Sequence, residues 1–373
     1  MTPDKSEEFI RSLLSLAGIA VGGERQSDIV VHNRDFYPRL VRDGVLGLGE
    51  SYMDGWWDCR ALDQFFDMVL RTRLEEKVKG NLSAAWPLIQ SRLFNLQSRN
   101  RAFQVGEQHY DLGNDLYIAM LDKRLNYTCG YWEHAWSLNK AQEAKLELVC
   151  KKIRLEPGMT VLELGCGFGS FAAYAASKYR VTVTGVTVSK RQVELGMQKC
   201  KGLPVHLRLM DYRGVEGKYD RVISIGIMEH VGYRNYRTYM EVVNRTLSDD
   251  GIAFIHTIGN NSSSTTTNAW TVKYIFPNGV LPSIAQLGKA MEGLFVMEDW
   301  HNFGPDYDKT LMAWHKNFEN AWPDLRKRYT ERFRRMWRYY LLSSAGGFRS
   351  RQTQLWQIVM TRPGRTQPDC RVS

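Results

Sequence analysis

A glycine-rich turn is the clearest chemical signal in the sequence. The apolar run 160–164 predicts a buried strand, and Gly165-Cys-Gly-Phe-Gly169 follows it directly, before a helical pattern that begins at Ser170. Glycines let a ligand approach the backbone closely, and the N–H groups at the start of a helix attract negative charge. Because ligands bind at the carboxyl ends of parallel strands, we expect a ligand at this turn. The alternative is a tight strand-to-helix turn that binds nothing.

The spacing of the turn indicates the kind of ligand. Glu163, Gly165, Gly167 and Gly169 form the pattern E-x-G-x-G-x-G, which differs from the G-x-G-x-x-G of dinucleotide-binding proteins. The pattern resembles the first motif of S-adenosylmethionine-dependent methyltransferases. A carboxylate at this position suits the ammonium or sulfonium charge of that cofactor.

The ends of the next two predicted strands could complete a cofactor site. In related folds the second strand usually ends in an acidic residue that binds the ribose hydroxyls, but this one carries no acid. We therefore expect Thr187, Ser189 and Gln192 to contact the cofactor, and Asp211 with Tyr212 to lie near an adenine. The alternatives are that Ser189 only caps the following helix and that Asp211 belongs to a solvated turn.

The elements that must position these residues follow a regular order. After residue 110, short β-branched runs alternate with helical patterns, which predicts an α/β fold with a mostly parallel sheet and helices on both faces. A long basic helical region separates the last two strands. The predicted strands are 160–164, 181–188, 205–211, 219–226, 251–256, 294–299 and 356–362. The predicted helices between them are 170–178, 190–200 and 236–247.

The first ninety residues predict a small α+β module. An apolar pattern at Phe9, Leu13 and Leu16 indicates one face of a helix that ends at Gly18, and 28–32 predicts a short strand. Several glycines between residues 44 and 55 predict a turn-rich stretch.

A series of short motifs then runs in order along nearly the whole chain. They are Glu107-Gln-His-Tyr-Asp-Leu-Gly-Asn-Asp-Leu-Tyr117, Tyr127-Thr-Cys-Gly-Tyr-Trp132, Leu164-Gly-Cys-Gly-Phe-Gly169, Gly185-Val-Thr-Val-Ser189, Met228-Glu-His-Val-Gly232, His256-Thr-Ile-Gly259 and Tyr274-Ile-Phe-Pro-Asn-Gly279. This series resembles the successive motifs of the bacterial cyclopropane-fatty-acid synthases. The segment Leu48-Gly-Glu-Ser-Tyr-Met-Asp-Gly-Trp-Trp57 is similar to the full-length bacterial enzymes, whereas the shorter mycolic-acid cyclopropane synthases lack that module.

The resemblance implies a fold, a division of the chain and an activity. The fold is a class I S-adenosylmethionine-dependent methyltransferase (Rossmann-like) domain with a smaller N-terminal α+β domain. We expect residues 1–90 to form a module for membrane or substrate positioning or dimerisation, 91–105 a linker, and 106–373 the catalytic domain. The implied reaction transfers a methylene from S-adenosylmethionine to the cis double bond of unsaturated phospholipid acyl chains. A carbocation forms on the way, so aromatic faces, a dry acyl tunnel and a base are needed.

The resemblance also implies that bicarbonate is the base and assigns the residues that hold it. Glu229 would orient the anion as an acceptor, His256 and Tyr307 would donate to it, and Tyr127 and Thr128 would join the cofactor site. The implied bicarbonate ligands are Cys129, Glu229, His256, Ile258 through its backbone, and Tyr307. Relatives can carry Cys where Ser344 stands here, so an active protein cannot need a thiolate at that position.

Each of these residues also has a structural interpretation. Cys129 could be a small buried hydrophobe, and Glu229 could belong to a salt-bridged loop. His256 could be a core histidine with its hydrogen bonds satisfied, and Tyr307 could be an ordinary loop aromatic.

Composition and charge narrow the class of protein. The chain has 373 residues, enough for two domains, and its net charge of +10 favours anionic partners. Its six cysteines show neither a disulfide framework nor zinc-ligand spacing, so we expect no metal site. No apolar run approaches the roughly 18 residues of a bilayer span, and the amino terminus lacks a signal-peptide core. We expect a cytoplasmic protein that associates peripherally with the membrane and, from the family, forms a homodimer.

The segment 324–340 holds seven basic and two acidic residues with aromatic residues at helical spacing. This pattern is typical of an amphipathic helix that binds anionic lipid. The alternative is an aromatic stripe that packs on the core below a solvated arginine face. Nucleic acid is a weaker candidate partner, because no recognised nucleic-acid module accompanies the segment.

Two other functions stay open at the level of sequence. A small-molecule N- or O-methyltransferase would use the same catalytic core, but the implied bicarbonate ligands and the amino-terminal module argue against it. A non-catalytic lipid-binding protein is disfavoured by the intact glycine turn.

Overall fold

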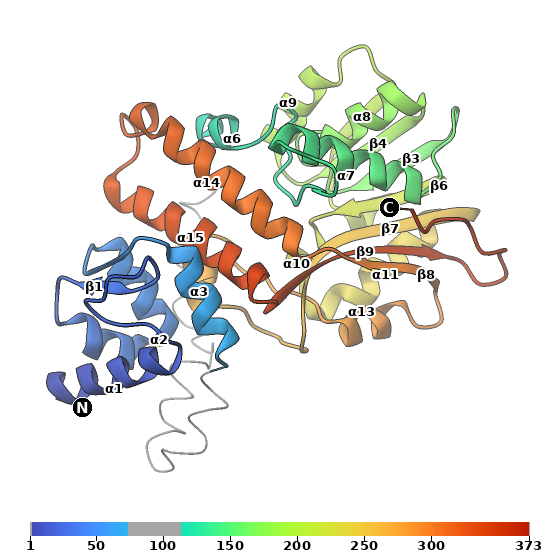
Figure 1. The fold of residues 1–373 in the computed structure, drawn as a ribbon. Coiled ribbons are helices and arrows are strands. Elements are labelled where there is room, and N and C mark those ends of the chain that lie inside the picture. Colours follow the sequence, from blue (N-terminus) through green and yellow to red (C-terminus); the bar gives the residue numbers. More distant parts are fainter. Residues whose placement is uncertain (1, 74–112, 373) are drawn as a thin grey trace. The chain divides into compact units, whose positions relative to one another are not determined.

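This computed structural model describes residues 2–73 and 113–372, which form two compact units (Figure 1). The first unit comprises the described residues of Met1–Met120 with Thr266–Gly279 and Tyr307–Thr353, and the second comprises Leu121–Thr265, Val280–Asp306 and Gln354–Ser373. Sequence reasoning predicted three consecutive parts, whereas three separate stretches of the chain form the first unit. The predicted linker 91–105 and the beginning of the motif at Glu107 lie outside the described residues.

A seven-stranded sheet forms the second unit, in the order β5-β4-β3-β6-β7-β9-β8. The first five strands in this order pair in parallel, and β8 pairs antiparallel with β9. Each predicted strand is confirmed, although β7 is longer than expected. The strands are β3 (Thr160–Leu164), β4 (Thr182–Thr187), β5 (Val205–Leu209), β6 (Tyr219–Ile225), β7 (Leu247–Asn260), β8 (Val296–Asn302) and β9 (Thr353–Thr361).

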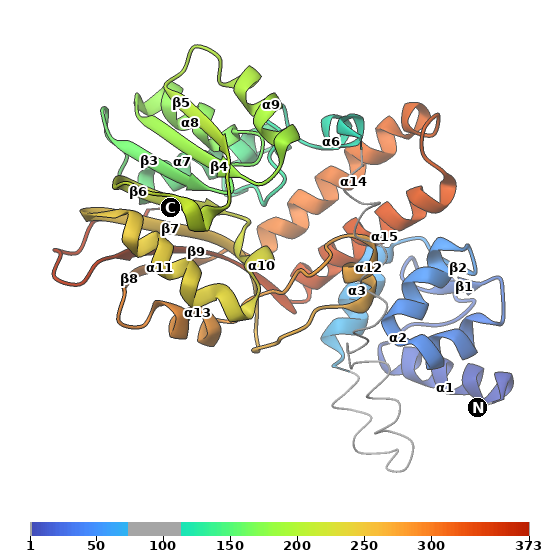
Figure 2. The ribbon, with the colours of Figure 1, turned by 180° about the vertical axis from the view of Figure 1, so that it is seen from behind.

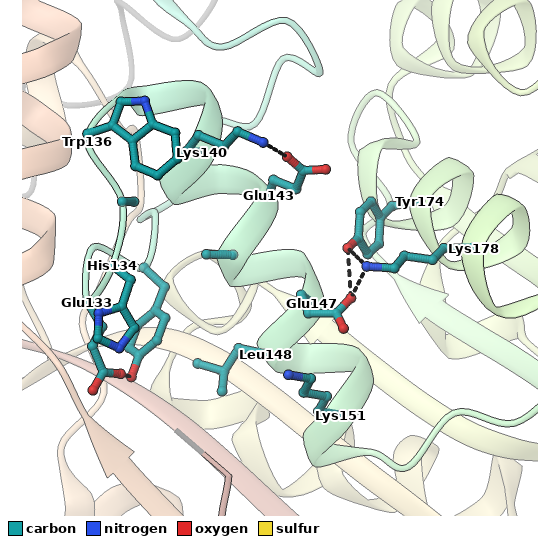
Figure 3. Close-up of a pocket in the computed structure, with 13 residues that line it drawn as sticks. Glu133, His134, Trp136, Lys140, Glu143, Glu147, Leu148, Lys151, Tyr174 and Lys178 are labelled. Carbon is teal, nitrogen blue, oxygen red and sulfur yellow. Dashed lines mark hydrogen bonds and ion pairs between the residues drawn. The ribbon is translucent and has the colours of Figure 1, made fainter.

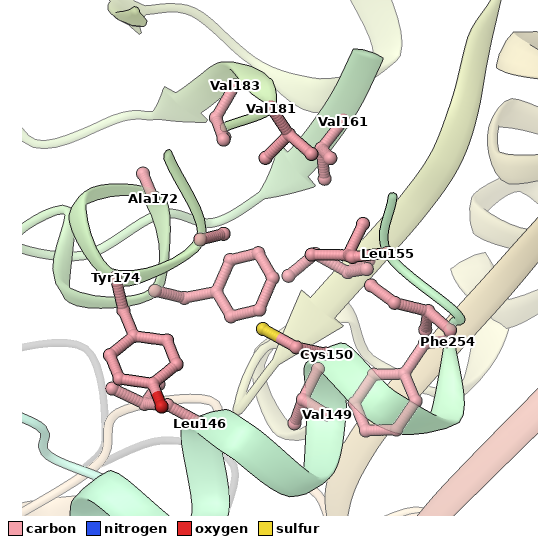
Figure 4. Close-up of a cluster of buried hydrophobic side chains, with 14 of the residues drawn as sticks. Leu146, Val149, Cys150, Leu155, Val161, Ala172, Tyr174, Val181, Val183 and Phe254 are labelled. Atoms are coloured by element: carbon pink, nitrogen blue, oxygen red, sulfur yellow. The ribbon is translucent and has the colours of Figure 1, made fainter. Parts of the chain in front are cut away.

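Helices cover both faces of this sheet, as the views in Figures 1 and 2 show. Alternate residues of one strand enter different cores: Val161 packs with α7 and α8, whereas Leu162 packs with α11 and α13. Figure 4 shows the first of these cores, in which Cys150 and Phe254 lie among aliphatic side chains. The helices and short turns are α7 (Leu138–Lys152), α8 (Ser170–Tyr179), α9 (Lys190–Lys199), η2 (Tyr212–Gly214), α10 (Met228–Val231), η3 (Tyr233–Asn235), α11 (Tyr236–Thr246) and α13 (Ile284–Met291).

The first unit is mainly helical, with a two-stranded antiparallel sheet of β1 and β2. Helix α15 packs on α3 and α2 within it. Its elements are α1 (Pro3–Leu16), β1 (Ile29–Val31), α2 (Phe36–Met53), β2 (Trp57–Cys59), α3 (Leu62–Arg71), α6 (Asn114–Met120), α12 (Ala269–Tyr274), most of α14 (Pro305–Leu325) and α15 (Glu331–Arg349).

Two predictions for the amino-terminal module are wrong. In α1 the buried apolar residues are Ile10, Leu13 and Leu14, while Leu16 is half-exposed, so the buried face is turned relative to the expected one. The expected turn-rich stretch is helix α2, interrupted only at Gly44, whose φ is 57°. Tertiary packing explains the glycines: a Cβ on Gly49 would lie 2.3 Å from Cδ1 of the Trp270 indole.

The basic aromatic segment 324–340 supports the core-packing alternative. Its helix begins at Glu331, and Tyr329, Phe333 and Trp337 stack along one side with centroid separations of 4.5 and 5.8 Å. Trp337 is fully buried. Most of its arginines pair with carboxylates of the same unit: Arg332 with Asp54, Arg334 and Arg338 with Glu319, Arg335 with Asp58, and Arg328 with Asp115.

Two findings bear on the expected class of protein. Within residues 2–73 and 113–372, none of the helices combines the length and the apolar character that a membrane span requires. All six cysteines fall in these ranges and are buried, and none forms a disulfide.

We expect Gly49→Ala to destabilise the protein. The added Cβ would overlap the buried Trp270 ring, and overpacking of this kind costs about 1–3 kcal/mol. The matched control is Gly288→Ala in α13, where a Cβ meets nothing within 4 Å and the helix should gain up to about 1 kcal/mol. Urea unfolding followed by circular dichroism measures both, and equal effects of the two substitutions would contradict the packing argument.

Candidate active site

The predicted glycine turn joins β3 to α8. Gly165, Gly167 and Gly169 have φ values of 79°, 50° and 73°, a backbone conformation that glycine adopts without strain. A Cβ on Gly165 would lie 2.1 Å from Cδ1 of Ile227, whereas a Cβ on Gly167 would meet no protein atom within 4 Å. The turn is therefore closed by protein at Gly165 and open at Gly167, where a ligand can approach the backbone.

Glu163 lies buried just before this turn. Burial raises the pKa of its carboxyl to about 8, against the effects of the Lys145 charge and of a hydrogen bond from the Ala172 N–H. Its Oε2 has no hydrogen-bond partner among the described residues. A buried acceptor without a partner suits a cationic group of a ligand, which fits the sulfonium or ammonium of S-adenosylmethionine.

The polar residues predicted at the end of β4 are close together. The Thr187 hydroxyl donates to Oε1 of Gln192 over 2.7 Å, and the Ser189 N–H donates to the Thr187 hydroxyl over 3.2 Å. Ser189 caps helix α9 by accepting from the Gln192 N–H, and its contact with a cofactor stays a prediction. Because these groups form hydrogen bonds with one another, they fix the conformation of the chain at the end of β4.

The end of β5 is held beside the end of β4, since the Met210 N–H donates to the Thr187 carbonyl over 2.9 Å. Asp211 caps the short helix η2 and pairs with Arg213 at 2.8 Å, which lowers the pKa of the Asp211 carboxyl. Tyr212 packs on Tyr239, with 4.9 Å between ring centroids. The parallel pairing of β3, β4 and β5 thus brings the glycine turn, Thr187 and Asp211 to the same edge of the sheet.

Glu229 is the centre of the second predicted cluster. It lies on α10, directly after β6, and its Oε1 accepts a 2.7 Å hydrogen bond from the backbone N–H of Ile258 in β7. Its own carbonyl accepts from the Val280 N–H over 2.9 Å. Its Oε2 is buried and has no partner among the described residues, and burial raises the pKa of its carboxyl to about 7.

His256 stands two residues before Ile258 on β7. The two side chains therefore lie on the same face of the sheet, about 7 Å apart along the strand. The ring is fully buried, and burial together with the charges of Lys145 and Lys152 lowers its pKa well below the ordinary value. Its Nε2 has no partner among the described residues, so these residues do not satisfy all the hydrogen bonds of the ring. The His256 imidazole is therefore neutral, and both it and the Glu229 carboxyl are buried with one polar atom that no described residue satisfies.

Cys129 belongs to a segment that lies against the end of β6. The thiol is fully buried and donates to the Gly130 carbonyl over 3.1 Å. A Cβ on Gly226 would lie 2.8 Å from the Thr128 Cγ2, and the Gly226 N–H donates to the His256 carbonyl. These contacts connect the segment that contains Tyr127, Thr128 and Cys129 to the strand ends that carry Glu229 and His256.

Sequence reasoning missed the residues that hold this segment in place. Lys145 and Gln142 of α7 are buried; Lys145 Nζ donates to the Thr128 hydroxyl over 3.0 Å and to Asn126 Oδ1 over 3.3 Å, and Gln142 Nε2 donates to the Thr128 carbonyl over 2.7 Å. Asp122 in turn accepts from the backbone and the amide of Asn126. The available signal was a lysine and a glutamine three residues apart within an otherwise apolar helix face.

Tyr307 and Ser344 belong to the first compact unit. Tyr307 is buried there, with its ring 4.5 Å from that of Phe348 and 6.0 Å from that of Trp314. Its implied role toward bicarbonate stays a prediction.

A separate polar pocket runs along α7 (Figure 3). Glu147 accepts there from Lys178 and from the Tyr174 hydroxyl, both over 2.8 Å, and Lys140 pairs with Glu143 at 3.2 Å. Of the described residues predicted for the cofactor or bicarbonate, none lines this pocket. Its charges are largely neutralised by one another.

The raised pKa of Glu229 predicts a pH-dependent stability. The folded protein keeps the Glu229 proton up to about pH 7, whereas the unfolded chain loses it near the ordinary pKa of 4.5. The contribution of Glu229 to the free energy of unfolding therefore falls as the pH rises from about 4.5 to about 7, by on the order of 3 kcal/mol. Glu229→Gln removes this titration, so the variant should gain stability relative to the wild type across that range.

Denaturant unfolding at several pH values measures the effect. The matched control is Glu143→Gln, whose carboxylate is half-exposed. If the stability difference between Glu229→Gln and the wild type were the same at pH 4.5 and pH 8, burial of an ionisable Glu229 would be refuted.

Comparison with known proteins agrees with this geometry. A family model described as mycolic acid cyclopropane synthetase matches residues 97–358. The cyclopropane-fatty-acyl-phospholipid synthase of Escherichia coli is 51% identical over 359 residues, covering 96% of this chain and 94% of that protein. A solved mycolic acid cyclopropane synthase complexed with SAH and CTAB is 30% identical, with a TM-score of 0.63 over 68% of this chain and 96% of that chain.

Coclaurine N-methyltransferase bound to N-methylheliamine and SAH has a TM-score of 0.64 over 85% of this chain and 99% of that chain, but is only 20% identical, so it shares the fold alone. The class I methyltransferase fold predicted from the sequence is thereby confirmed. The extent of these matches shows that this chain belongs to the cyclopropane synthase family that its motifs resemble.

Proposed function

We propose that this protein is an S-adenosylmethionine-dependent cyclopropane-fatty-acyl-phospholipid synthase that uses bound bicarbonate as its base. The observation that carries the proposal is the combination, in one unit, of an open glycine turn with two buried polar atoms, Glu229 Oε2 and His256 Nε2, that have no partner among the described residues. The Escherichia coli relative, 51% identical over nearly the whole length, supports the same activity.

S-Adenosylmethionine supplies an electrophilic methyl group when bound. The open backbone at Gly167 would allow close approach of the cofactor, and the unpartnered Oε2 of Glu163 would accept from or balance its cationic group. Thr187, Asp211 and Tyr212, at the neighbouring strand ends, would contact the rest of the molecule. Tyr127 and Thr128 would join the cofactor site, and Lys145 and Gln142 hold Thr128 in place.

Addition of a methyl group to an alkene leaves a carbocation, and closing the ring requires removal of a proton. The neutral His256 would donate a hydrogen bond to a bound bicarbonate, and the Ile258 N–H fixes the Glu229 carboxyl that would orient it, so these residues would hold an anion that supplies the base. Oε2 of Glu229 is suited to accept a hydrogen bond from the hydroxyl of bicarbonate. Cys129 would complete this part of the site, and the role that the family resemblance implies for Tyr307 stays a prediction.

The surroundings of these polar groups are buried and partly aromatic. Cys129 and His256 are fully buried, and the ring of Phe303 lies 6.0 Å from that of His256 and 5.4 Å from that of Tyr131. Aromatic faces stabilise a cation without trapping it, and a dry site prevents its hydration.

The substrate requires contact with a membrane. We infer that the protein works in the cytoplasm, docks peripherally on anionic phospholipid through its net charge of +10, and forms a homodimer. The amino-terminal part of the first unit would serve membrane or substrate positioning or dimerisation. Since the arginines of 324–340 are mostly paired, other basic surfaces would contribute to docking.

The activity is tested with vesicles of cis-unsaturated phospholipid and methyl-labelled S-adenosylmethionine, followed by mass analysis of the acyl chains. We expect a gain of one CH2 per alkene consumed, and a fall in rate when dissolved carbonate is removed and its recovery when bicarbonate is added back. Glu229→Gln should slow turnover at least about 100-fold with little change in cofactor affinity, because one acceptor in the site is lost. Label transferred to an amine, with unchanged lipid, would refute the proposal.

The cofactor position is tested with Gly167→Ala. The new Cβ meets no protein atom, so the cost in stability should be limited to the left-handed backbone, about 1–2 kcal/mol. Cofactor affinity measured by calorimetry should fall by at least tenfold, since the methyl group enters the space assigned to the ligand. The control is Gly202→Ala, which also has a positive φ and an open surrounding but lies away from the predicted site. Equal cofactor affinity of the two variants would exclude the turn as the binding site.

A further inference from the structure

Gln357 contacts the predicted catalytic histidine. It lies on β9, which is the neighbour of β7 in the sheet, and its side chain is fully buried. Its Nε2 is 3.4 Å from Nδ1 of His256. Gln357 was not among the residues predicted from the sequence, because a glutamine in an apolar strand carries no motif of its own.

The two side chains share one face of the sheet. Phe254 and Val359, two residues from His256 and Gln357 on their strands, both enter the core beneath α7 and α8. His301 of β8 is directly opposite Gln357 in the antiparallel register, and Phe303 packs on both histidine rings, at 6.0 and 4.9 Å. The amide is therefore confined between two strands, and the His256 ring is confined by an aromatic neighbour.

The amide nitrogen of Gln357 is the atom that faces the imidazole. In this arrangement the Gln357 Oε1 and the His256 Nε2 have no partner among the described residues. An amide nitrogen donates hydrogen bonds and accepts none. Gln357 is therefore the donor and Nδ1 of His256 the acceptor.

We propose that Gln357 is a positioning residue that holds His256 in the tautomer with its proton on Nε2. A neutral imidazole has one N–H, so a donor at Nδ1 forces that proton to the other nitrogen. Nε2, which has no partner among the described residues, then presents a donor to the anion. The last step rests on the proposed function, whereas the tautomer itself does not.

The tautomer is measured directly by long-range proton–nitrogen NMR of protein with 15N-labelled histidine, the His256 signals being assigned by their loss in His256→Asn. We expect the wild type to show Nε2 protonated and Nδ1 unprotonated. Gln357→Leu should give a mixture of tautomers, and Gln357→Glu should move the proton to Nδ1, because a carboxylate accepts there. A wild-type protein with its proton on Nδ1, or a Gln357→Glu protein with an unchanged tautomer, would overturn the inference.

The kinetic consequence is measured in the vesicle assay. Gln357→Glu and Gln357→Leu should lower kcat by about 10- to 100-fold while KM for S-adenosylmethionine stays the same, the size of effect typical of residues that orient a reacting side chain. The control is Gln354→Leu, a buried glutamine of the same strand that bonds to Asn302 and Asn261 instead. It should keep the His256 tautomer and most of kcat. If neither the wild type nor any of these variants gave a cyclopropane product in the vesicle assay, the proposed function would be refuted. The tautomer measurement would still decide the role of Gln357.

Discussion

The hydrogen bond from the Ile258 N–H to the Glu229 carboxyl is the contact on which the rest of the site depends. It ties α10, directly after β6, to β7 and fixes the direction of a buried carboxyl. A buried carboxyl with one fixed oxygen and one unused oxygen is costly to keep. Its retention is explained if a ligand satisfies the second oxygen during the reaction.

The polar residues of the site share one face of an otherwise apolar sheet. Glu163 on β3, His256 on β7 and Gln357 on β9 each lie two residues from a side chain in the core beneath α7 and α8. Helix α7 supplies the buried Lys145 and Gln142, which hold the segment that contains Cys129. Within the described residues, this packing leaves Glu163 Oε2, His256 Nε2 and Gln357 Oε1 buried without a hydrogen-bond partner, which suits contact with ligands.

The sequence predicted the strands of the sheet well because each is a short β-branched run between clear turn signals. It also placed the glycine turn, Glu229 and His256 at strand ends, where the parallel register brings them to one edge. It failed at α2, since helix propensity cannot reveal that Gly49 is needed for contact with Trp270, more than two hundred residues away. Lys145 and Gln357 were missed for the same reason: their roles come from tertiary contacts, and neither stands in a recognisable motif.

The central claim is that the buried cluster around Glu229 and His256 binds bicarbonate. The most direct measurement is NMR of 13C-labelled bicarbonate titrated with the wild-type protein and with Glu229→Gln. The wild type should shift or broaden the bicarbonate signal with one site per chain, and Glu229→Gln should weaken that binding at least tenfold. Absence of binding to the wild type, or equal binding by both proteins, would contradict the claim.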